Sequence, residues 1–132
     1  MKPEYSVIVP GVLFVGSHPE RSGPLVEILK LLKAESVAGV ISLVERPLHT
    51  EALSEAGLEG LHLKVANYAA PTSEQLLEGV QFIERMKSQG KVALAHCFAG
   101  IGRAGTMGAT YLVSLGASPD QAVEEMRRRR HF

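Results

Sequence analysis

Short apolar segments that alternate with helical segments most constrain the fold of this chain. The apolar runs are rich in β-branched residues and bounded by Gly or Pro, and the segments between them repeat apolar residues every three or four positions. We expect strands at 5–15 (a pair turning at Pro10-Gly11), 37–44, 60–65 and 92–95. Helices are expected from Pro24, at 50–56, from Thr72 to Gly90, up to about Leu115, and from Ser118. This order predicts an α/β fold, with a central, mostly parallel sheet of about four to five strands and helices on both faces.

Composition narrows the class of protein. A chain of 132 residues with 45% hydrophobic residues suits one domain, residues 1–132, with one core. The formal net charge is zero and no apolar run reaches about 18 residues, so we expect neither a nucleic-acid nor a membrane partner. The only cysteine is Cys97, which excludes an intrachain disulfide and a cysteine-based zinc cluster. No signal peptide opens the sequence, and we expect a cytoplasmic monomer.

The segment Ala95–Thr106 (AHCFAGIGRAGT) carries the chemistry. A strand ends, Cys97 follows, and five residues later Arg103 opens a helix. A short glycine-rich loop entering a helix presents unpaired backbone N–H groups and the positive end of the helix dipole, which together bind an anion and favour a cysteine thiolate. Arg103 adds a planar guanidinium suited to two phosphate oxygens. The predicted phosphate-binding residues are Phe98, Ala99, Gly100, Ile101, Gly102 and Arg103.

The C-x5-R spacing, preceded by His96, resembles the signature of the protein tyrosine phosphatase superfamily, in particular its compact dual-specificity-like members. The similarity covers roughly residues 7–130, including Val9–Val15, ISLVERP at Ile41–Pro47 and VANYAAP at Val65–Pro71. The resemblance implies that Cys97 is the nucleophile, that Arg103 holds the phosphoryl oxygens, and that His96 orients the cysteine loop from below. It implies no metal and no cofactor, since the loop supplies the positive field.

Two positions depart from the pattern of the family. Ala104 stands where relatives usually have a Ser or Thr whose hydroxyl bonds to the cysteine sulfur. Asn67 stands where relatives have the aspartate general acid, and an amide cannot deliver a proton. Glu45 is the best substitute acid, because it matches a glutamate of the subgroup on the same edge. The alternative for Glu45 is an ion pair with Arg46 or Arg103.

We therefore expect a cysteine-dependent phosphatase that hydrolyses phosphotyrosine or other phosphate monoesters through a phosphocysteine intermediate. Its partners would be a phosphorylated protein or a small phosphate monoester, with phosphate or sulfate binding in the loop. The alternative is a weakly active or inactive pseudophosphatase that binds phosphorylated ligands. A sulfur transferase or arsenate reductase ranks last, because the reductase needs resolving cysteines that this sequence lacks.

Two further expectations concern the C-terminal part of the chain. Met107 and Tyr111 are four positions apart on one expected helix, a spacing that predicts two core side chains. The run Arg127–Arg130 is expected to be a solvated helix end that complements the helix dipole. Its alternative is a docking patch for acidic or phosphorylated partners.

Overall fold

A five-stranded sheet forms the centre of the protein, in the order β1-β2-β5-β3-β4. The computed structural model describes residues 1–130; residues 131 and 132, the end of the predicted domain, lie outside this range. The strands are β1 (Tyr5–Val9), β2 (Leu13–Gly16), β3 (Val37–Ser42), β4 (Glu59–His62) and β5 (Val92–His96). Only the β1–β2 hairpin is antiparallel, and the other three pairings are parallel. The predicted mostly parallel sheet is confirmed.

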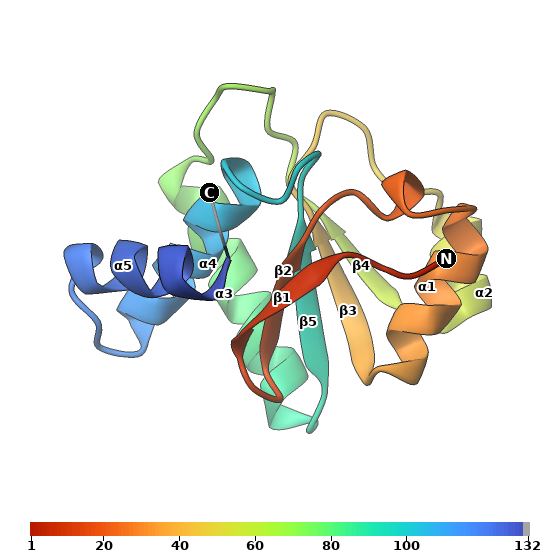
Figure 1. Ribbon diagram of the computed structural model, residues 1–132, viewed down its shortest axis with the longest axis horizontal. Helices are drawn as coiled ribbons and strands as arrows, with labels where there is room; N and C mark the ends of the chain where they lie inside the picture. Colours follow the sequence, from red (N-terminus) through yellow and green to blue (C-terminus); the bar gives the residue numbers. More distant parts are fainter. Residues whose placement is uncertain (131–132) are drawn as a thin grey trace.

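Helices cover both faces of the sheet, as predicted (Figure 1). Helices α1 (Leu25–Ala34) and α2 (Thr50–Ala56) pack on one face, after a short 3-10 turn at Pro19–Arg21. Helices α3 (Ser73–Ser88), α4 (Arg103–Ser114) and α5 (Pro119–Arg129) pack on the other. The predicted core side chains Met107 and Tyr111 are both fully buried, in the core that α3, α4 and α5 form against the sheet.

Two parallel strands end earlier than the sequence predicts. β3 and β4 stop together at the Ser42–His62 pair, and the amide of Leu63 makes a last bond of 2.9 Å to the Ser42 carbonyl. Residues 63–65 were expected to continue the strand, because Leu63 and Val65 are apolar and alternate. Both are buried, but Val65 has left the sheet and its carbonyl accepts a hydrogen bond from Arg103.

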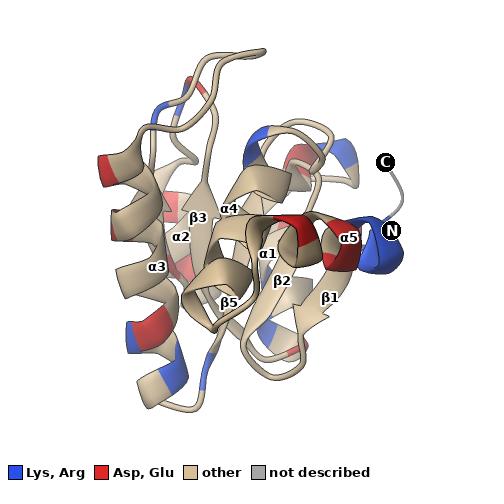
Figure 2. Cartoon of the chain, turned by 90° about the vertical axis from the view of Figure 1, so that its left-hand side faces the viewer, with Lys and Arg blue, Asp and Glu red and all other residues tan. Residues whose placement is uncertain are grey.

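The arginine run at the end of α5 divides into two parts, which corrects the expectation of a uniformly solvated helix end. Arg127, Arg128 and Arg129 are exposed in the last turn of α5, which Figure 2 shows as a continuous stretch of basic residues. Arg130 is only 6% exposed, because the chain becomes extended there and turns its side chain inward. The expectation was therefore wrong for Arg130.

Three loops meet at the edge where the parallel strands have their carboxyl ends. They follow β3, β4 and β5, and they rise together from the upper edge of the sheet in Figure 1. The first carries Glu45, the second Asn67 and the third Cys97. Ligands of open parallel sheets bind at such an edge, so the fold brings the predicted site residues to the expected place. None of the helices within residues 1–130 combines the length and the apolar character needed to span a bilayer.

Candidate active site

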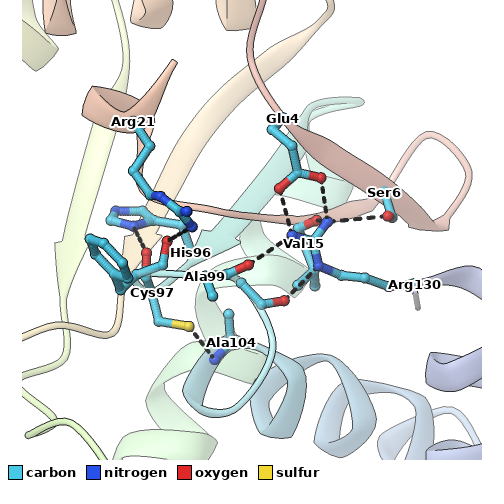
Figure 3. A network of polar contacts seen from close by, with 11 residues as sticks. Glu4, Ser6, Val15, Arg21, His96, Cys97, Ala99, Ala104 and Arg130 are labelled. Atoms are coloured by element: carbon cyan, nitrogen blue, oxygen red, sulfur yellow. Dashed lines mark hydrogen bonds and ion pairs between the residues drawn. The ribbon is translucent and has the colours of Figure 1, made fainter. Parts of the chain in front are cut away.

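Cys97 lies directly after β5, at the foot of the loop that leads into α4. Its side chain is nearly buried, at 3% exposure. The backbone N–H of Ala104, in the first turn of α4, points at the sulfur with an N to Sγ distance of 3.4 Å (Figure 3). The sulfur therefore lies beside the N-terminus of a helix, where an N–H group stabilises negative charge.

The backbone carbonyls of the loop are held from behind by the rest of the protein. Four successive carbonyl oxygens, those of residues 97–100, accept hydrogen bonds from groups outside the loop or beneath it. His96 Nδ1 donates to the Cys97 carbonyl (3.2 Å). The Phe98 carbonyl accepts from the His18 backbone N–H (2.9 Å) and from Arg21 Nη1 (3.3 Å). Arg130 donates from Nη2 to the Ala99 carbonyl (3.0 Å) and from Nε to the Gly100 carbonyl (2.6 Å).

The loop amides are arranged in the opposite way. Within the described part of the chain, the N–H groups of residues 98–103 donate to no other protein group. In a trans peptide the N–H points away from the carbonyl of the same unit, and no peptide in residues 1–130 is cis. Carbonyls held at the back therefore turn the amides toward the front. Gly100, at φ +73°, permits the left-handed turn this requires. Backbone amides that face one side of a loop in this way can bind an anion.

Arg103 flanks this cradle. It is 6% exposed, and its Nη1 atom donates to the Val65 carbonyl and to Glu45 Oε1, both at 2.9 Å. Nε and Nη2 donate to no protein group among residues 1–130. One side of the guanidinium is therefore fixed by the protein, while the other has two donors available for an oxyanion.

His96 supports the loop from underneath and is neutral. It is fully buried, and burial lowers its pKa to about 3. Since a carbonyl oxygen only accepts, the contact to Cys97 assigns the ring proton to Nδ1, and the Ser42 hydroxyl then donates to Nε2 at 2.7 Å. A neutral histidine with a hydrogen bond on each ring nitrogen fits the expected role of orienting the cysteine loop, and not the role of a base.

Glu45 forms the ion pair with Arg103 that was the alternative to its acid role. Its Oε2 atom accepts from the backbone N–H of Asn67 at 3.1 Å, while Oε1 accepts from Arg103. The Asn67 N–H, then the backbone of Glu45 itself and the Arg103 guanidinium, lower the pKa of Glu45. A lowered pKa keeps the carboxylate ionised, whereas a general acid must carry a proton. The geometry therefore disfavours Glu45 as the acid.

Asn67 lies where the sequence predicted it, at the rim of the site. It lines a cleft of about 500 Å³ together with Cys97, Arg103, Tyr68 and Phe98. Its Oδ1 atom accepts from the Tyr68 amide at 3.1 Å, which fixes the side chain against its own loop. The cleft is therefore lined both by Cys97, the predicted nucleophile, and by the amide side chain of Asn67, at the position predicted for the proton donor.

No metal centre accompanies these residues in the part of the chain that the structure covers. There, no three His, Cys, Asp or Glu side chains lie close enough together to hold a metal ion. The positive field at the site comes from backbone amides and from Arg103.

Sequence reasoning missed the residues behind the loop. Ser42, His18 and Arg130 each hold His96 or a loop carbonyl, yet none belongs to the C-x5-R segment. The helical spacing that places Ala122 and Met126 on the inner face of α5 does not extend to Arg130, because the chain is extended at that residue. Ser42 and His18 carry no signal of their contacts in the sequence either.

Comparisons with known proteins agree with this geometry. Residues 15–117 match the model of a family described as "Polymorphic toxin system, DSP-PTPase phosphatase". A human protein named phosphatidylglycerophosphatase and protein-tyrosine phosphatase 1 is 34% identical over 97% of this chain, and its mouse counterpart is 34% identical over 75%. The chain spans 65% of the human relative and 55% of the mouse relative.

Solved structures show the same fold. Tk-PTP, in a crystal structure described as the active form, has a TM-score of 0.84 at 33% identity, covering 98% of this chain and 86% of the other. PTPMT1 has a TM-score of 0.83 at 28% identity, covering 96% and 83%. PTPMT1 has also been solved in complex with PI(5)P, with a TM-score of 0.84. With the family match spanning most of the sheet and the whole cysteine loop, the chain belongs to the DSP-PTPase family, as a compact dual-specificity-like member of the protein tyrosine phosphatase superfamily.

Proposed function

We propose that this protein is a cysteine-dependent phosphatase that hydrolyses phosphate monoesters through a phosphocysteine intermediate. The observation that carries the proposal is the placement of the Cys97 sulfur beneath a loop whose carbonyls are tied back and whose amides are unpaired within residues 1–130. Such a cradle stabilises the charge that develops on the equatorial oxygens of a transferring phosphoryl group.

In the first step the Cys97 thiolate attacks phosphorus, and the ester oxygen leaves with the bonding electron pair. The free donors of Arg103 and the loop amides bind the three non-bridging oxygens. The departing oxygen needs a proton unless it is a stable anion, and Asn67 cannot supply one. Substrates with good leaving groups are therefore favoured in this step.

In the second step water attacks the phosphocysteine, phosphate forms, and the sulfur leaves as a thiolate. The Ala104 N–H, 3.4 Å from Sγ, stabilises that leaving sulfur. Relatives with a hydroxyl at this position add a second donor. With the Ala104 N–H as the single donor to the sulfur among residues 1–130, the second step is expected to limit turnover of substrates with good leaving groups.

The substrate class that we propose is a phosphorylated protein side chain or a phosphorylated small molecule, including a lipid headgroup. The exposed residues Tyr68 and Phe98, which line the cleft, support this range, because side chains exposed to solvent leave room for different leaving groups. The names of the mammalian relatives and the PI(5)P complex of PTPMT1 add weight to a phosphorylated lipid.

Binding of phosphorylated ligands without turnover is the second candidate, and Asn67 and Ala104 favour it. The two functions share the cradle and differ only in chemistry. A phosphate-release assay separates them. In a binding module, bound phosphate protects Cys97 from alkylation, but the protein releases no phosphate from an ester.

The test uses para-nitrophenyl phosphate with purified protein. The parent should release phosphate, and Cys97→Ser should abolish release, since a serine at its ordinary pKa is no nucleophile here. Arg103→Lys should lower kcat/KM by about 10²- to 10³-fold, the scale for one lost oxyanion donor. Arg128→Lys is the matched control, because Arg128 is exposed on α5, and it should act like the parent. Turnover by Cys97→Ser within tenfold of the parent would overturn the covalent mechanism.

A further inference from the structure

Arg130 is the most extensively bonded side chain behind the cysteine loop. It is nearly buried, and its three nitrogens make six hydrogen bonds to protein acceptors. Two acceptors are the loop carbonyls of Ala99 and Gly100. The others belong to the N-terminal hairpin and the segment before it: both carboxylate oxygens of Glu4, Ser6 Oγ at 3.2 Å and the Val15 carbonyl at 3.1 Å (Figure 3).

The two loop contacts fix the direction of two amides in the cradle. The Ala99 carbonyl shares its peptide plane with the Gly100 N–H, and the Gly100 carbonyl shares its plane with the Ile101 N–H. Arg130 holds both carbonyls, at 3.0 and 2.6 Å, on the side away from the cleft. It therefore orients two of the amide donors from the carbonyl side of the loop.

The contacts on the other side of Arg130 make this hold rigid. Both carboxylate oxygens of Glu4 accept hydrogen bonds from the Arg130 guanidinium. This pairing fixes the plane of the guanidinium and neutralises its charge. The loop also lies directly on the end of β2: a Cβ added at Gly100 would come within 2.4 Å of the Gly16 backbone and 2.6 Å of Arg130 Nη2. The loop has no space to shift toward the hairpin while Arg130 is in place.

Direct binding of substrate by Arg130 does not fit these contacts. Nε donates to Gly100, Nη2 to Ala99 and Glu4, and Nη1 to Glu4, Ser6 and Val15, so each nitrogen is already engaged. We propose that Arg130 is a positioning residue, which sets the orientation of the Gly100 and Ile101 amides and through them the oxyanion affinity of the cradle. This inference rests on the proposed function for its effect on turnover, but not for its effect on anion binding.

The test compares Arg130→Lys with the parent, because lysine keeps the charge but lacks the planar fork that reaches both carbonyls. The first readout is the concentration of inorganic phosphate that half-protects Cys97 from iodoacetate. We expect it to rise at least about tenfold in Arg130→Lys, and kcat/KM for para-nitrophenyl phosphate to fall by at least about tenfold. Arg128→Lys, on the exposed face of the same helix, should change neither value.

A second variant distinguishes positioning from general loss of folding. Arg130→Ala removes the whole fork, and guanidinium ion added at non-denaturing concentration should restore phosphate protection several-fold. The same salt should leave the parent and Arg128→Ala unchanged at matched ionic strength. Circular dichroism and the thermal midpoint show whether each variant is folded.

Glu4→Gln serves if both Arg130 variants fail to fold, because the Glu4 side chain is half exposed and the change is nearly isosteric. The substitution weakens the hydrogen bonds between Glu4 and Arg130. The phosphate concentration that half-protects Cys97 should therefore rise about threefold or more. A half-protecting phosphate concentration within twofold of the parent value in a folded Arg130→Lys variant would overturn the inference. If the Arg130 variants do not fold, the same result in Glu4→Gln would overturn it. If the parent binds phosphate but releases none from the ester, the proposed function fails, and phosphate protection alone still decides the role of Arg130.

Discussion

Glu45 joins two of the three loops of the site, and this placement defines its role at the scale of a single residue. Its carboxylate receives the Asn67 amide on one oxygen and Arg103 on the other. The first contact holds the loop that lines the cleft, and the second holds the guanidinium in position. We therefore expect Glu45 to act through Arg103 and Asn67, as a positioning residue.

Glu45→Gln is therefore expected to lower kcat/KM by about 3- to 10-fold, equally for para-nitrophenyl phosphate and phenyl phosphate, because a weakened Arg103 affects both substrates. A general acid would instead give a loss of about 10²-fold or more, confined to the poorer leaving group. Glu55→Gln changes an exposed carboxylate on α2 and should match the parent. A loss seen only with phenyl phosphate would restore the acid role of Glu45.

Asn67→Asp should supply the missing proton donor. The side chain lines the cleft above Cys97, so a protonated carboxyl there would face the leaving oxygen. We expect turnover of phenyl phosphate to rise by about tenfold or more, with little change for para-nitrophenyl phosphate. Asn67→Ala is the control for loss of the contact to the Tyr68 amide. An equal gain on both substrates would mean that the loop had moved and that no acid had been gained.

Ala104→Ser should speed the second chemical step. Ala104 is fully buried beside the sulfur, so an added hydroxyl must bond to Sγ or to the preceding helical turn. A hydroxyl that donates to Sγ stabilises the leaving thiolate, so the steady-state rate should rise several-fold while the burst amplitude stays unchanged. Ala109→Ser places the same group elsewhere on α4 as a control. An unchanged steady-state rate would show that dephosphorylation is not limiting.

Residues near the cysteine were predictable because one segment contains both the chemistry and its spacing. Cys97 and Arg103 were identified from C-x5-R, and the structure places both at the cleft floor. The sequence does not decide whether Arg46 or Arg103 is the partner of Glu45, since it does not show which way a loop side chain turns. Contacts such as Ser42 to His96 join residues 54 positions apart, and no local pattern specifies them.

At the scale of elements, α3 anchors the loop that carries Asn67. Thr72 and Gln75 form a capping box at its N-terminus, as the TSEQ segment predicted. Gln75 does more than cap the helix: its Nε2 atom donates to the Lys64 carbonyl at 2.8 Å, across the base of the loop. Helix α5 has the equivalent capping box at Ser118 and Gln121.

Gln75→Ala and Gln121→Ala form a matched pair that isolates this tether. Both remove one side of a capping box, so each should lower the free energy of unfolding by about 0.5–1 kcal/mol in urea titrations. Only Gln75→Ala also frees the loop, so only it should increase hydrogen exchange at amides 65–71. Equal exchange in the two variants would show that the Lys64 contact does not restrain the loop.

Elements were predictable to the extent that their signals are local. The capping boxes, the Pro10-Gly11 turn and the period of α1 were read correctly because each lies within a few residues. The ends of β3 and β4 were not, because a strand ends where its partner ends. The apolar alternation to Val65 reflects burial, which continues after pairing has stopped.

At the scale of the whole molecule, the site depends on contacts between the two ends of the chain. Arg130 and Glu4 are 126 positions apart, yet both lie behind the loop at residues 97–102. The sheet order makes this possible, since β2 lies beside β5 and α5 packs on α4. Such closure follows from the assembled fold, which explains why sequence patterns alone assigned Arg130 to the solvent.

The same assembly makes the stability of the protein depend on pH. His96 has a pKa of about 3 when folded because it is buried, against 6.5 for an ordinary histidine, so between these values the unfolded chain binds a proton that the folded one does not. The free energy of unfolding should therefore decrease as the pH falls from 6.5, by up to about 1.4 kcal/mol per pH unit. Below about pH 4.5 Glu4 adds to the loss, since Arg130 holds its pKa below the ordinary value and protonation weakens that pair. Urea unfolding between pH 7.5 and 5 measures the slope. His96→Gln should flatten the slope, even if the substitution destabilises the protein at pH 7.5. A parent protein equally stable at pH 7 and pH 5 would show that His96 is protonated without disrupting the support beneath Cys97.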